Sequence, residues 1–132
     1  MILFLRFLFA VVIGSMLCVT GWAGLHQSLG AFAQSATFRD PWVIATLFDA
    51  YWAFITFFVW VAWKEQSVVA RGRWFISIML LGNMAMAAYM LAQLFSVPAS
   101  GPLDAVFTRR QPGKLALPAV LTVISIGIYL LA

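Results

Sequence analysis

The fold is decided by one stretch of sequence, residues 40–65, which reads DPWVIATLFDAYWAFITFFVWVAWKE. Asp40 followed by Pro41 is a strong helix-start signal, because aspartate caps the free N–H groups of a first turn and proline suits the first helical position. Trp42 and Trp63 bracket the apolar run, and tryptophan favours the headgroup region of a bilayer. A run of about 20 apolar residues is long enough to cross that bilayer. The stretch therefore predicts a transmembrane helix over residues 42–63.

The composition extends this prediction to the whole chain. Of its 132 residues, 64% are hydrophobic and 9% are charged, whereas a soluble domain carries about 25% charged residues. Similar apolar runs cover residues 2–25, 74–95 and 115–132. We therefore predict an all-α membrane protein with a single integral membrane domain over residues 1–132, a bundle of four transmembrane helices with short loops. A soluble globule is excluded.

Two segments of this bundle have an alternative interpretation, its first helix and its last loop. Residues 2–25 resemble a signal peptide in having a basic residue before an apolar stretch, but signal cores run about 7–15 residues, so we expect a retained helix. In residues 103–114, apolar side chains stand beside Arg109 and Arg110. This pattern is typical of a short helix lying in the interface, and a solvated loop explains it equally well.

The orientation of four crossings is not fixed by charge. Four basic residues fall on each side of the membrane; they are Arg6, Lys64, Arg71 and Arg73 on one side, and Arg39, Arg109, Arg110 and Lys114 on the other. We expect both termini in the cytoplasm, of a bacterial inner membrane, because Lys64, Arg71 and Arg73 crowd one tight loop. The net charge of +4 suits anionic lipid headgroups rather than nucleic acid.

Asp49 is the only acidic residue inside a predicted span. It follows Trp42 by seven residues, which places it roughly 10 Å below the interface. A carboxylate at membrane depth costs about 2.5–3.5 kcal/mol on insertion scales and usually faces protein or water. Helical spacing puts Thr46 and Thr56 on the same stripe. Two interpretations stay open: a proton or cation site, and a hydrogen-bonded acid that holds this helix against its neighbours, which we favour.

Equal depth in antiparallel spans suggests partners for these polar groups. Tyr89 is expected at the depth of Asp49, where its hydroxyl can donate to the carboxylate. Asn83 is expected near mid-membrane, at the depth of Thr56, which predicts a hydrogen bond between these two side chains.

The single His and the single Cys offer little chemistry. His26 can supply one axial ligand to a haem or pigment, but an interfacial, hydrogen-bonded imidazole is the simpler interpretation. Cys18 is expected to be a buried, inert thiol. We predict no cofactor and no metal site, and expect bound lipid.

Several short motifs carry a resemblance to one family. In chain order they are Asp40-Pro41-Trp42, Ala45-Thr46-Leu47, Asp49-Ala50-Tyr51, Trp60, Lys64-Glu65, Leu81-Gly82-Asn83 and Gln93-Leu94-Phe95. With them the sequence resembles the small membrane proteins grouped as domain of unknown function 1475, from the first helix to Arg109 and Arg110. The resemblance implies an integral membrane protein and brings no activity or substrate with it.

The sequence leaves three functional hypotheses. The first is a non-catalytic accessory or assembly subunit of a larger membrane complex, such as an energy-transducing one, which contacts lipids and other subunits or a second copy. The second is a small proton- or cation-coupled carrier or channel that uses Asp49. The third and weakest is a membrane enzyme acting on lipid or quinone through Lys64, Glu65 and the arginines, since no nucleophile–base pair or metal-ligand cluster is visible.

Overall fold

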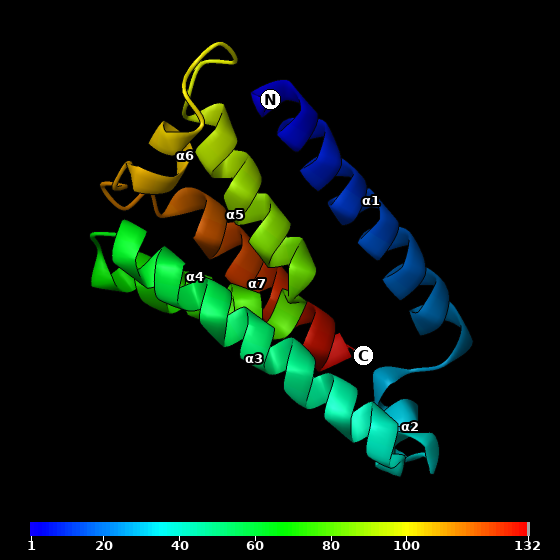
Figure 1. Cartoon of the computed structure of the whole chain (residues 1–132). Coiled ribbons are helices and arrows are strands. Elements are labelled where there is room, and N and C mark those ends of the chain that lie inside the picture. Colours follow the sequence, from blue (N-terminus) through cyan, green and yellow to red (C-terminus); the bar gives the residue numbers. More distant parts are fainter. Residues whose placement is uncertain (132) are drawn as a thin grey trace.

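The computed structural model describes residues 1–131 and is all helical (Figure 1). The elements are α1 (Ile2–His26), α2 (Leu29–Gln34), the 3-10 turn η1 (Thr37–Arg39), α3 (Pro41–Lys64), α4 (Val68–Leu81), α5 (Asn83–Phe95), α6 (Asp104–Thr108) and α7 (Ala116–Leu131). The predicted all-α class is confirmed.

Helices α1 and α3 are, by length and composition, able to cross a membrane. The Asp40 carboxylate accepts a hydrogen bond from the backbone N–H of Trp42 at 2.8 Å, so α3 begins at the expected cap. It ends at Lys64, one residue beyond the predicted span. Each helix contributes to the core only at one end, through Ile2 of α1 and through Val61 and Lys64 of α3, and no residue from 3 to 60 is buried.

The predicted single helix over residues 74–95 is wrong. Gly82 divides it into α4 and α5, with a φ of 52° that side-chain-bearing residues rarely adopt. A Cβ at this glycine would lie 2.6 Å from Cζ of Phe54. The break therefore exists where the backbone bends closely against the aromatic ring of α3.

After this break the chain turns back instead of continuing across. The rings of Trp74 on α4 and Tyr89 on α5 lie 4.8 Å apart and nearly perpendicular, and both belong to one core cluster with Val61 of α3. Helices α4 and α5 have 14 and 13 residues, so each is only about 20 Å long, short of the roughly 30 Å of a bilayer core. They form a helical hairpin whose open ends lie together.

Helix α7 runs beside α4 in the same direction. Thr122 bonds to the Arg73 carbonyl at 3.1 Å, and the Tyr129 hydroxyl donates to the Leu80 carbonyl at 3.0 Å. The predicted span 115–132 thus contains a helix over 116–131, and residue 132 lies outside the described residues. Within the expected interfacial segment 103–114, only α6 is helical.

This path gathers the basic residues at one end of the molecule, which we call the basic end. It holds the start of α1, the end of α3, both open ends of the hairpin, α6 and the start of α7 (Figure 1). Seven of the eight Lys and Arg residues belong to it: Arg6, Lys64, Arg71, Arg73, Arg109, Arg110 and Lys114. The expected four-against-four division is wrong, because it assumed that residues 74–95 cross.

The same path separates the two chain ends. Ile2 packs with Leu94, Val97 and Val106 at the basic end, whereas α7 starts there and runs away from it. Within the described residues, Ile2 therefore lies at the basic end and the end of α7 lies away from it, beside Leu80 near the bend of the hairpin. Away from the basic end, α1 and α3 extend beyond the hairpin towards α2 (Figure 1).

Candidate functional site

A buried polar cluster closes the basic end. Lys64 and Glu65, at the end of α3, are 0% and 3% exposed. The Lys64 ammonium donates to the Val106 carbonyl and lies 5.1 Å from the Trp60 ring centroid. The Glu65 carboxylate accepts a hydrogen bond from the Tyr89 hydroxyl at 3.0 Å. Both residues directly follow the predicted span 42–63, but the chain after α5 folds over them.

Gln111 ties that covering segment to the end of α3. Its backbone N–H donates to the Lys64 carbonyl at 2.9 Å, and its own carbonyl accepts from the Gln66 N–H at 3.1 Å. Its side chain donates to that of Gln93, which is buried on α5, at 2.8 Å. One glutamine thus joins α3, α5 and the segment between α5 and α7.

Burial raises the pKa of the Glu65 carboxyl above its ordinary value. The hydrogen bond from Tyr89 and the charges of Lys64 and Arg71 act in the opposite direction and only partly offset it. Arg71 also donates to the Glu65 backbone carbonyl at 2.8 Å. The carboxyl group therefore holds its proton to higher pH than an exposed glutamate does.

The polar groups of this cluster are satisfied within the protein, which indicates a structural role. Among residues 1–131, the only buried side-chain polar atom without a hydrogen-bond partner is Nε of Arg6, which lies outside this cluster. In the same described part of the chain, no three His, Cys, Asp or Glu residues are grouped to hold a metal ion. The satisfied hydrogen bonds hold the open ends of the α4–α5 hairpin against α3 and α6.

The predicted pairing of Tyr89 with Asp49 is wrong, since the Tyr89 hydroxyl donates to Glu65. The predicted bond between Thr56 and Asn83 is also absent from the described residues. Thr56 donates to the Trp52 carbonyl of its own helix at 2.9 Å, and Asn83 is exposed. Both errors come from placing residues 74–95 as one straight crossing.

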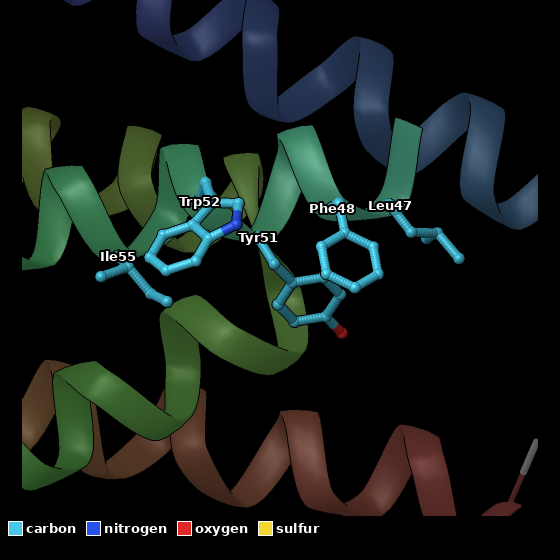
Figure 2. A pocket seen from close by; sticks show the side chains of 5 residues that line it. All are labelled: Leu47, Phe48, Tyr51, Trp52 and Ile55. Atoms are coloured by element: carbon cyan, nitrogen blue, oxygen red, sulfur yellow. The ribbon is translucent and has the colours of Figure 1, made fainter. Parts of the chain in front are cut away.

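Asp49 instead lies on an exposed face of α3. Within residues 1–131 its carboxylate takes part in no hydrogen bond and no ion pair, and Thr46 beside it donates to the Trp42 carbonyl of the same helix at 2.8 Å. Figure 2 shows the adjoining side chains, which line a hollow of about 290 Å³ and all come from α3. They are Leu47, Phe48, Tyr51, Trp52 and Ile55. Asp49 is not among them, since it lies about 60° around the helix from Trp52 and farther from the other four. We use the name α3 face for the exposed part of α3 that holds Asp49 and these five residues.

The remaining candidate residues are scattered. His26 is exposed, and its Nδ1 lies 2.8 Å from the Trp22 carbonyl, as expected of an interfacial imidazole. Cys18 is exposed, which corrects the expected burial, because α1 packs on α5 only along its first half. Arg73 donates to the Leu115 carbonyl at 3.4 Å, so it fastens the start of α7.

The structural roles of Gln93, Gln111 and Arg6 were not predicted from the sequence. Arg6 reaches from α1 to the turn after α5, where it donates to the carbonyls of Leu94 and Val97 at 2.9 and 2.8 Å. The available signal was the presence of Arg6 and Gln93 within long apolar runs, where polar side chains need protein partners.

An apolar groove of about 650 Å³ lies between α1, α3, α5 and α6. Phe9 of α1, Trp60 of α3 and Phe107 of α6 line it towards the basic end, and Asn83 lines it near the bend. Met86 and Met90 of α5 also line it. The groove thus runs along the side of the hairpin.

Comparison with known proteins gives one match. The family model described as "Protein of unknown function (DUF1475)" matches residues 1–125, nearly the whole chain. No curated protein and no solved structure matches it. The match covers α1 to α5, α6 and the first part of α7, including both the polar cluster and the α3 face. The chain therefore belongs to the DUF1475 family.

Proposed function

We propose that the protein is a non-catalytic integral membrane subunit that docks other membrane proteins through the α3 face. It is an accessory or assembly subunit of a larger complex. The proposal rests on the exposure of Asp49, whose carboxylate forms no hydrogen bond and no ion pair within residues 1–131. A carboxylate facing acyl chains costs about 2.5–3.5 kcal/mol on insertion scales, so a partner that supplies a donor or a cation stabilises the inserted chain.

The aromatic residues beside Asp49 support the same conclusion. Trp52 is 63% exposed and lies in the middle of α3. Tryptophan prefers the interface of a bilayer, where its N–H finds a partner, rather than the centre. A helix of another subunit packed on this face covers both the indole and the carboxylate.

In the membrane arrangement that we propose, α1 and α3 cross, the α4–α5 hairpin enters and leaves on the basic side, and α7 enters from that side beside α4. The four-crossing bundle is thereby revised. The positive-inside rule places the basic end in the cytoplasm, because seven of the eight basic residues belong to it. The N-terminus then lies in the cytoplasm, and the end of α7 lies beside Leu80, near the bend of the hairpin.

Photocrosslinking tests the docking proposal. A photoreactive phenylalanine replaces Phe48 on the α3 face, and in a control chain it replaces Phe4, whose exposed fraction of 62% matches the 64% of Phe48. We expect position 48 to crosslink to one membrane protein in native membranes, and expect Asp49→Asn to reduce that product. Crosslinks to lipid alone at position 48, or the same protein captured equally at position 4, would refute the proposal.

A second candidate function is a proton- or cation-coupled carrier or channel. It is favoured by the broken helix at Gly82, since discontinuous helices are frequent in transporters, and by the uncovered Asp49. In liposomes, this candidate requires a pH-dependent ion flux that Asp49→Asn abolishes and Asp104→Asn leaves intact. A wild-type protein that supports no flux excludes it.

A further inference from the structure

We propose that an anionic phospholipid binds at the basic end, with an acyl chain in the groove between α1, α3, α5 and α6 and its phosphate at Arg6 and Arg109. This site lies on the other half of the molecule from Asp49 and does not depend on the docking role of the α3 face. It requires only that the protein sits in a membrane.

The shape and lining of the groove suit an acyl chain. Its volume of about 650 Å³ falls within the roughly 300–1,000 Å³ of small-molecule sites. Met86 and Met90 give it a deformable wall, because methionine side chains adapt to irregular apolar shapes. Its polar lining groups stand at its two ends, with the Asn83 side chain near the bend and the indole N–H of Trp60 beside α6.

The length of the groove argues against a second transmembrane helix as its occupant. From Asn83 to Met90 along α5 is seven residues, or about 10 Å. A partner helix that crosses the roughly 30 Å core would extend far beyond it. The groove also stops beneath α6, where Trp60 Nε1 donates to the Phe107 carbonyl at 3.3 Å.

Two arginines stand directly beyond the end of the groove that α6 covers. Arg6 precedes the groove residue Phe9 by three positions on α1, and Arg109 follows Phe107 by two. Both guanidinium groups converge on one turn, because Arg6 donates to the Leu94 and Val97 carbonyls and Arg109 donates to the Ser96 carbonyl at 3.1 Å.

The charge at this turn is not neutralised by the protein. Within residues 1–131 neither Arg6 nor Arg109 forms an ion pair with a carboxylate, and Nε of Arg6 is buried without an acceptor. Arginine forks match phosphate oxygens in geometry and charge. An anionic headgroup at the cytoplasmic surface therefore complements the two arginines while its chain fills the groove.

Native mass spectrometry of the intact protein tests the site. The protein is reconstituted with equal amounts of phosphatidylglycerol and phosphatidylcholine of the same chains, and retained lipids are counted after release from the detergent micelle. We expect one retained phosphatidylglycerol, and about a fivefold loss of preference over phosphatidylcholine for each arginine replaced. The variants are Arg109→Gln alone and together with Arg6→Gln, since Arg6 also holds the turn 94–97.

Two further variants make the test specific. Ala87 is buried and lines the groove, so Ala87→Phe should lower retention of both lipids, with helicity checked by circular dichroism. Arg39→Gln removes the one basic residue outside the basic end and should change nothing. The proposal is overturned if the wild type shows no preference for phosphatidylglycerol, or if Arg39→Gln weakens that preference as much as Arg109→Gln does. It is also overturned if inorganic phosphate displaces the lipid, or if a second copy of the chain fills the groove.

Discussion

At the scale of single residues, the positions of Lys64 and Glu65 differ most from what their sequence context indicates. A Lys-Glu pair between two apolar runs is typical of a solvated turn, yet both side chains are buried. The groups that satisfy them, Val106 and Tyr89, lie 42 and 24 residues further along the chain. No local pattern reveals such partners, because the burial results from the path of residues 96–115.

The hydrogen bond between Tyr89 and Glu65 gives a first prediction. Tyr89→Phe keeps the ring but leaves a buried carboxyl oxygen without its donor, which costs about 1–3 kcal/mol. We expect the free energy of unfolding in detergent to fall by this amount. Tyr51→Phe, at an exposed ring of α3, is the matched control and should change it little. Equal losses in both variants would contradict the assignment.

The raised pKa of Glu65 gives a second prediction. An acid that binds its proton more tightly in the folded state stabilises the fold fully below its ordinary pKa of about 4.3 and loses that contribution as pH rises through the raised value. The free energy of unfolding should therefore decrease with pH above about 4.3. Glu65→Gln retains an acceptor for Tyr89 and does not titrate, so the free energy of unfolding of this variant should decrease less with pH. The same decrease in the variant and in the wild type would contradict the role given to Glu65.

At the scale of elements, the sequence predicts the bounds of α3 but does not predict the hairpin. Asp40, Pro41 and the charges after Trp63 mark both ends of α3, and the observed bounds agree within one residue. Gly82 gives no comparable signal, because glycine also occurs inside straight membrane helices. Its positive φ becomes necessary only when Phe54 lies against it, which is a tertiary contact.

The break at Gly82 gives a third prediction. Gly82→Ala must hold a side chain at a φ of 52° and against the Phe54 ring, so we expect a loss of about 1–3 kcal/mol in the free energy of unfolding. Gly72 lies inside α4, and no neighbouring atom stands within 4 Å of the place that a Cβ would take there. Gly72→Ala should therefore stabilise α4 by up to about 1 kcal/mol. An unchanged free energy of unfolding in Gly82→Ala would show that the bend does not require glycine at this position.

At the scale of the whole molecule, the hairpin explains both the exposed α3 face and the groove at the basic end. Because α4 and α5 return to the basic end, their bend reaches only the depth of Phe54, about 15 Å along α3 from Lys64. The half of α3 that carries Asp49 is left without neighbours from the hairpin. The same return brings Arg109, Arg110 and Lys114 to the side of the other cations, where α1, α3 and α5 leave the groove between them.

The direct test of this account is the sidedness of two engineered cysteines in a Cys18→Ser background. Gln66→Cys lies between α3 and α4, and Lys114→Cys lies just before α7; both positions are exposed. If residues 68–95 form a hairpin, a membrane-impermeant thiol reagent labels both only from the cytoplasmic side, and labels Gln34→Cys only from the opposite side. Labelling of positions 66 and 114 from opposite sides of the membrane would contradict the hairpin and restore four crossings.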